Sequence, residues 1–242
     1  KNLLLYLYRE KMVTLAYYQK WNDIDTFHDK IYDSIDWKNE NQVEEYAYIC
    51  SSGAELCHKM LQWEKLLMFA GWMQELAEDY GAGEREIYFN DKVHYYYLYT
   101  KFLKVEAVSI ATQLEGWGFF GLESIQQLIG EIEANEMIGD FAGILIGAKA
   151  LKVGADDEIT DVEVREYLTL AENLLERYPD NALLAEKVIF LWHTVYEFQY
   201  KKKVPKPIVD RAYALTLRFV TEEDVLHEFF EMLTDSTETG NW

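Results

Sequence analysis

Lys20-Trp21-Asn22 is followed 42 residues later by Gln62-Trp63-Glu64, and Lys104-Val105-Glu106 comes at the same spacing again. Each segment stands between two stretches whose apolar residues have the spacing of an α-helix. Apolar positions recur with the segments: Leu5, Ala47 and Phe89; Met12, Ala54 and Tyr96; Ile24, Leu66 and Val108; Phe27, Phe69 and Ala111. A fixed period with a helix pair in each copy is typical of helical repeat proteins, which mostly serve as binding surfaces.

The apolar pattern predicts helices along the whole chain. Helices are expected at 3–20, 23–35, 42–61, 64–80, 86–103, 105–115, 121–133, 136–152, 161–178, 181–200, 206–219 and 222–234. Gly81-Ala82-Gly83 should end the fourth helix, and Thr160 or Asp161 should cap the ninth. No segment shows the sustained alternation of a strand. We therefore predict an all-α fold, in which residues 1–242 form a single TPR-like, right-handed superhelix of about eleven or twelve antiparallel helices.

Charge and composition exclude several function classes. The net charge is −20, so this stretch alone should not bind DNA or RNA. The sequence has neither a signal peptide nor an apolar run of roughly 18 residues, and we expect no membrane contact. Cys50 and Cys57 are expected to be reduced core residues on one helix face, which favours a cytoplasmic protein. Because the chain begins at Lys1 instead of Met, we expect it to be a fragment.

The charged clusters offer little for catalysis. Asp156-Asp157 with Asp161 resembles a metal-binding aspartate motif, but a second such motif is missing, so a solvated loop is favoured. Glu55 and His58 have the spacing of a di-iron helix without its partner motifs. The basic cluster at 201–206 is expected to be a solvated turn. We therefore expect no enzyme activity, no metal and no cofactor.

Aromatic residues provide the candidate binding site. The helix at 86–103 carries Tyr95, Tyr96, Tyr97 and Tyr99, which cannot all face one core. The 42-residue alignment puts Tyr96 and Tyr99 on the buried stripe and leaves Tyr95 and Tyr97 on other faces. One interpretation is packing against a neighbouring repeat. The other is a concave groove for an apolar peptide, which Trp192 and Tyr196 would also line.

Two segments carry a family resemblance. Leu114-Glu115-Gly116-Trp117-Gly118-Phe119-Phe120 resembles the L-x-x-W-x-x-Y/F signature in the repeat domain of Rgg/GadR/MutR-type transcription regulators. The Glu that usually follows this signature is replaced by Gly121. Glu186-Lys187-Val188-Ile189-Phe190-Leu191 is similar to the E-K-x-x-x-F segment near that family's C-terminus. The tyrosine-rich opening helix is also similar.

The resemblance implies a regulator of a Gram-positive bacterium. Members of the family carry an N-terminal helix-turn-helix DNA-binding domain, and their helical array forms a homodimer and, in several members, binds a short peptide pheromone in quorum sensing. This chain would be the array alone and would reach DNA only through the domain absent from it. The family has an Asn ten residues after the signature Trp, so the resemblance assigns Gln127 to the ligand site.

Two other hypotheses stay open on the sequence. One is a stand-alone TPR-like scaffold that docks a protein partner, and the other is an all-α enzyme with a metal-bound substrate. The helices within 181–234 are rich in apolar residues, among them Phe190, Phe229 and Phe230, so we expect them to form much of a homodimer contact. An ordinary core with a capping helix is the alternative for that segment.

Overall fold

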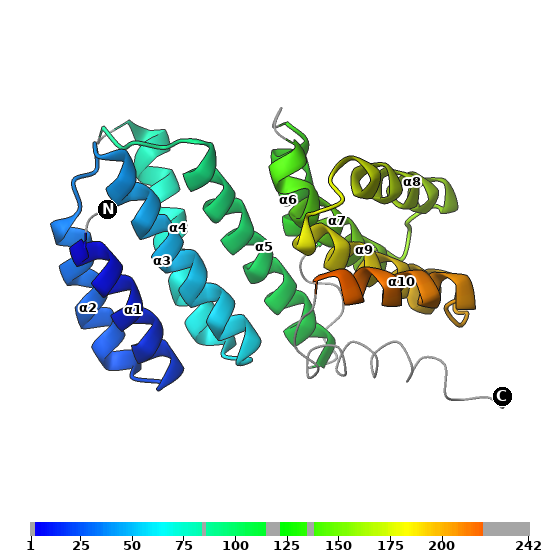
Figure 1. Ribbon diagram of the computed structural model, residues 1–242, viewed down its shortest axis with the longest axis horizontal. Coiled ribbons are helices and arrows are strands. Elements are labelled where there is room, and N and C mark those ends of the chain that lie inside the picture. The colour runs from blue at the N-terminus through cyan, green and yellow to red at the C-terminus, as the bar shows by residue number, and fades with distance from the viewer. Residues whose placement is uncertain (1–2, 84–85, 115–121, 135–137, 220–242) are drawn as a thin grey trace. The chain divides into compact units, whose positions relative to one another are not determined.

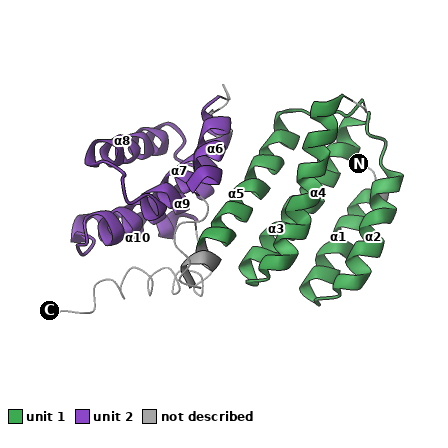
Figure 2. Cartoon of the chain, turned by 180° about the vertical axis from the view of Figure 1, so that it is seen from behind, with its two compact units in different colours: residues 1–111 green, residues 112–242 purple. Residues whose placement is uncertain are grey.

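The computed structural model describes residues 3–83, 86–114, 122–134 and 138–219 (Figure 1). Every regular element in these ranges is helical, which confirms the predicted all-α fold. The chain divides into two compact units, residues 1–111 and 112–242 (Figure 2), and each is described by itself. The single domain and the right-handed superhelix stay predictions.

Unit 1 is built from helices that lie side by side (Figure 1). They are α1 (Leu3–Tyr17), α2 (Trp21–Ser34), α3 (Glu40–Lys59), α4 (Trp63–Ala82) and α5 (Asp91–Leu114). α3 packs against α1 and α4, and the apolar residues at three- and four-residue steps along it, from Val43 to Cys57, are buried. α4 ends where the glycines predicted, because Gly83 adopts a left-handed conformation with φ of 67°. The helix pairs therefore share one continuous core through α3.

The first two helix pairs turn in the same way. Gln19 and Leu61, which are 42 residues apart, both have a φ of 55°. The backbone N–H of Lys20 donates to Leu15 over 2.8 Å, and that of Gln62 donates to Cys57 over 2.8 Å. In both pairs, this hydrogen bond ends the first helix, and the residue before its donor has the left-handed conformation. The 42-residue period is thus confirmed for its first two copies.

The third copy differs, and one prediction was wrong. α5 runs without interruption from Asp91 to Leu114, so the helices predicted at 86–103 and 105–115 are one helix. The left-handed residue is exposed in the first two copies, whereas its counterpart Leu103 is buried. Val105 and Glu106 are buried as well, so a turn at this point would remove packed side chains from the core. Burial therefore favours the continuous helix.

The repeated turn gives a direct stability prediction. Leu61 is 66% exposed and holds a left-handed conformation that strains a residue with a β-carbon. We expect Leu61→Gly to raise the free energy of unfolding by about 0.5–1 kcal/mol, measured by urea denaturation with circular dichroism. Leu103→Gly, at the equivalent buried helical position, should lower it by about 3 kcal/mol or more. A loss of stability in Leu61→Gly would contradict the role given to this turn.

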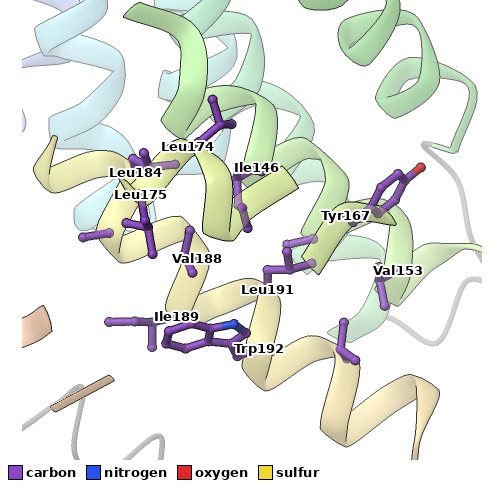
Figure 3. Packing of buried hydrophobic residues seen from close by; sticks show 14 of the residues in the cluster. Ile146, Val153, Tyr167, Leu174, Leu175, Leu184, Val188, Ile189, Leu191 and Trp192 are labelled. Carbon is purple, nitrogen blue, oxygen red and sulfur yellow. The ribbon is translucent and has the colours of Figure 1, made fainter. Parts of the chain in front are cut away.

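Unit 2 contains α6 (Leu122–Glu133), α7 (Ile138–Ala155), α8 (Asp161–Arg177), α9 (Ala182–Thr194), the π-helical turn η1 (Val195–Gln199) and α10 (Lys206–Phe219). α9 packs mainly against α7, and side chains of α7, α8 and α9 form the core in Figure 3. Thr160 caps α8 by accepting a hydrogen bond from the Glu163 N–H over 3.2 Å, as predicted. The helix predicted at 222–234 lies outside the described residues, which contain ten α-helices.

Candidate functional site

A cleft of about 350 Å³ opens on unit 1 among α1 and α3, the first helices of the two helix pairs, and the long helix α5. Its lining residues recur at three- and four-residue steps, so each helix presents one face to the cleft. They are Leu5, Tyr6 and Arg9 of α1, Asn41, Glu44, Glu45 and Tyr48 of α3, and Lys92 and Tyr96 of α5. A volume of this size falls in the range of small-molecule and peptide subsites.

Arg9 is fixed at the cleft wall by rings and by a carboxylate. Its guanidinium carbon lies 4.6 Å from the ring centre of Tyr6 and 5.3 Å from that of Tyr48. Nε and Nη2 donate to Oε1 of Glu10 over 3.1 Å and 2.9 Å. These hydrogen bonds from Arg9 to Glu10 raise the pKa of the guanidinium. Arg9 therefore contributes a cation that already has a carboxylate partner.

Lys92 and Glu44 form a second ion pair that joins α5 to α3. The Lys92 ammonium donates to Oε2 of Glu44 over 2.6 Å, and Nδ2 of Asn90 donates to Oε1 over 2.7 Å. Burial alone would raise the pKa of Glu44, but the hydrogen bonds from Lys92 and Asn90 outweigh it and lower that pKa. Glu44 is thus held as a carboxylate with both oxygens occupied.

Glu45 and two tyrosines complete the cleft. Oε1 of Glu45 is buried and has no hydrogen-bond partner among the described residues; Nη1 of Arg9 lies 3.6 Å away. The rings of Tyr48 and Tyr96 meet edge to face, with centroids 5.4 Å apart. Burial raises the pKa of the Tyr96 hydroxyl. The site thus combines apolar ring surface with the carboxylate of Glu45, which has an ion-pair partner in Arg9 but no hydrogen bond at Oε1 from the described residues.

Tyr95 and Tyr97, the two tyrosines of α5 predicted to bind a ligand, lie on either side of Tyr96 in the sequence. Tyr96 lines the cleft, whereas neither Tyr95 nor Tyr97 belongs to its lining. The Tyr95 ring stacks on Tyr99 with centroids 6.1 Å apart, and Tyr97 stacks beside His94 at 6.3 Å. The 42-residue alignment assigned Tyr96 to the buried stripe, but its side chain is only half buried. Tyr95 and Tyr97 thus lie beside a tyrosine of the cleft without lining it, and their role in ligand binding stays a prediction.

The other predicted site residues belong to unit 2. Gln127 is exposed on α6, Trp192 is 2% exposed within the core of Figure 3, and Tyr196 lies half-buried in η1 with its ring 5.5 Å from Tyr200. The Trp117 signature at 114–120 lies almost wholly outside the described residues. The ligand-binding role of Tyr95, Tyr97, Gln127, Trp192 and Tyr196 stays a prediction.

The remaining charged motifs form ordinary ion pairs. Glu55 accepts from Lys59 over 2.8 Å, and His58 Nε2 lies 2.9 Å from Oε2 of Glu106. Asp156 lies 3.8 Å from Lys152. Within the described ranges, no group of three or more His, Cys, Asp or Glu side chains is placed to hold a metal ion.

Cys50 and Cys57 are both free and buried, as predicted, and burial raises the pKa of each thiol to about 12. Such thiols are poor nucleophiles at neutral pH.

A membrane-crossing helix is not found in the described part of the chain, where every helix is too short or too polar.

Comparison of the chain with protein-family models, curated proteins and solved structures found no match. A functional interpretation therefore depends on the cleft of unit 1, which brings three helices, three tyrosines and four charged side chains to one place.

Proposed function

We propose that this chain is the ligand-sensing and dimerisation domain of a cytoplasmic transcription regulator, and that the cleft of unit 1 binds a short peptide. The observation that carries the proposal is the composition of the cleft, whose walls come from α1, α3 and α5. Helical repeat proteins bind extended ligands on a face shared by successive repeats, and this cleft has that placement. The resemblance to Rgg/GadR/MutR-type regulators supports the same class of ligand.

A peptide suits the chemistry of the lining. Tyr6, Tyr48 and Tyr96 present amphipathic rings, which can cover apolar side chains and whose hydroxyls can form hydrogen bonds. Asn41 lies at the start of α3 with an exposed amide, which can both donate to and accept from a peptide backbone. A purely apolar molecule would leave these polar groups unused. The mixed lining therefore favours a short peptide over a lipid.

The proposed regulation is a shift between conformations. The cleft takes residues from three helices, so a peptide that contacts all three stabilises the arrangement in which they converge. That arrangement would then set the positions of two DNA-binding domains in a homodimer. A helix-turn-helix encoded immediately before Lys1 would support this regulator, and light scattering would establish the oligomeric state, which stays a prediction.

Peptide binding can be tested with tyrosine variants. We expect the protein to retain members of a pool of fluorescent octapeptides. Tyr48→Ala and Tyr96→Ala should each lower the affinity for the retained peptides roughly tenfold, measured by fluorescence anisotropy, because each removes a wall of the cleft. Tyr17→Ala is the matched control, since Tyr17 is an exposed tyrosine of α1 that does not line the cleft. Equal losses in all three variants, or no retained peptide, would contradict the proposal.

A further inference from the structure

We infer that the peptide bound by the cleft is rich in proline and binds as an uncharged polyproline II helix. This inference rests on the proposed function of the cleft and specifies the class of its ligand. It starts from the hydrogen-bonding groups of the lining, which offer donors to a ligand while the carboxylates are already engaged within the protein. A ligand that accepts more hydrogen bonds than it donates therefore suits the cleft.

The charged side chains of the lining have partners on the protein. Lys92 donates to Oε2 of Glu44 over 2.6 Å, and Arg9 donates to Glu10. Nη1 of Arg9 also lies 3.6 Å from Oε1 of Glu45, an oxygen that is buried. The two cations and two carboxylates of the lining thus balance, and a charged group of the ligand would have to displace one of these partners. The lining therefore favours an uncharged segment.

The donors offered to that segment are the amide of Asn41 and the hydroxyls of three tyrosines. The described contacts of Tyr6, Tyr48 and Tyr96 are made by their rings, and the Asn41 side chain is exposed. Each hydroxyl can donate one hydrogen bond and the amide two, and peptide carbonyls are the matching acceptors. Proline keeps its carbonyl but has no backbone N–H. A proline-rich segment therefore accepts from these donors without needing acceptors in return.

The helical walls of the cleft also limit the backbone conformation of the ligand. α1, α3 and α5 form their backbone hydrogen bonds internally, so they give an extended β-strand no edge to pair with. An α-helical ligand would likewise satisfy its own carbonyls and make no use of the donors in the cleft. A polyproline II helix has no internal hydrogen bonds, and its stiffness lowers the entropy cost of binding.

The three tyrosine rings form a connected surface for such a ligand. The guanidinium carbon of Arg9 lies 4.6 Å from the ring centre of Tyr6 and 5.3 Å from that of Tyr48, whose ring lies 5.4 Å from that of Tyr96. These contacts link the rings of α1, α3 and α5. One turn of a polyproline II helix has three residues and is about 9 Å long, so prolines on one face of the ligand can contact more than one ring.

Two matched pools of fluorescent octapeptides test the inference. Both have acetylated and amidated ends and contain only uncharged residues. In one pool four positions are proline, and in the other the same four positions are alanine. We expect the proline pool to bind at least roughly tenfold more tightly in anisotropy titrations, because it is stiffer and has fewer donors.

The outcomes separate this inference from peptide binding itself. Equal affinities of the two pools, or tighter binding of the alanine pool, would overturn the inference and leave peptide binding intact. Retention of peptides from the mixed pool of the tyrosine experiment but none from the proline pool would do the same. If the protein retained no peptide from any pool, both the inference and the proposed function would be contradicted.

Variants that lose only a hydroxyl test the role of the donors. Tyr48→Phe and Tyr96→Phe keep the rings and should each lower the affinity for the retained proline-rich peptides roughly three- to tenfold, because a peptide carbonyl loses its donor. Tyr17→Phe removes the hydroxyl of an exposed tyrosine outside the cleft and should have no effect. Unchanged affinity in both cleft variants, or an equal loss in Tyr17→Phe, would overturn the inference.

Discussion

Replacing Gly143 with alanine is expected to lower the free energy of unfolding by about 2–3 kcal/mol. Gly143 lies on α7 where the start of α9 crosses it, and a β-carbon there would meet the side chain of Leu183 at 2.7 Å and the backbone N of Leu184 at 2.9 Å. A backbone atom cannot move aside as the end of a flexible side chain can. The two helices would have to separate, and the core between them would loosen.

Gly130→Ala is the matched control in the same unit. Gly130 lies inside α6, and a β-carbon there would meet no atom of the described residues within 4 Å apart from its own helix backbone and chain neighbours. Alanine should therefore stabilise that helix by about 0.5–1 kcal/mol through its higher helix propensity. Urea denaturation followed by circular dichroism measures both variants. If Gly143→Ala were as stable as Gly130→Ala, the close approach of α7 and α9 would be excluded.

The sequence predicted the helices well because their causes are local. The turns at Gln19 and Leu61 repeat with the apolar pattern, and the end of α4 at Gly83 follows from a glycine that tolerates positive φ. Asn181 and Thr160 cap the helices that follow them through short-range hydrogen bonds. Each of these features depends on residues within one or two helical turns, so the sequence shows it directly.

The failed prediction at Lys104 depended on distant contacts. The period alone cannot show that Leu103 and Glu106 are buried, and this burial favours a continuous α5 over a turn. Tertiary packing overrode the repeat in its third copy, where the anchor tryptophan is also replaced by Val105. The loss of that aromatic residue was a signal that this copy differs from the other two.

The cleft was missed for a similar reason. Arg9, Glu45 and Lys92 are separated by more than thirty residues from one another, and nothing local to each predicts that α1, α3 and α5 bring them together. Their three- and four-residue spacing from Tyr6, Tyr48 and Tyr96 is visible in the sequence. An alignment of charged and aromatic positions across the first helices of the repeats would have pointed to this face.

The second large effect on stability is expected for Trp192, because the structure buries this side chain in a core. The sequence suggested a groove wall, but the indole is 2% exposed in the core of unit 2 (Figure 3). The guanidinium carbon of Arg211 lies 5.4 Å from the centre of its ring. We expect Trp192→Ala to lower the free energy of unfolding by about 3–5 kcal/mol, since it removes the whole side chain and leaves a cavity. Urea denaturation with circular dichroism avoids the change in tryptophan fluorescence.

Two companion variants separate packing from ligand binding. Phe198→Ala removes an aromatic ring that is 47% exposed in η1, and it should cost about 1 kcal/mol or less. Trp192→Phe keeps most of the buried volume, so the fold should persist and peptide affinity can be measured. If the cleft of unit 1 is the binding site, that affinity should stay within roughly twofold of the wild type. A tenfold loss of affinity in Trp192→Phe, with stability little changed, would instead support the predicted role of Trp192 in ligand binding.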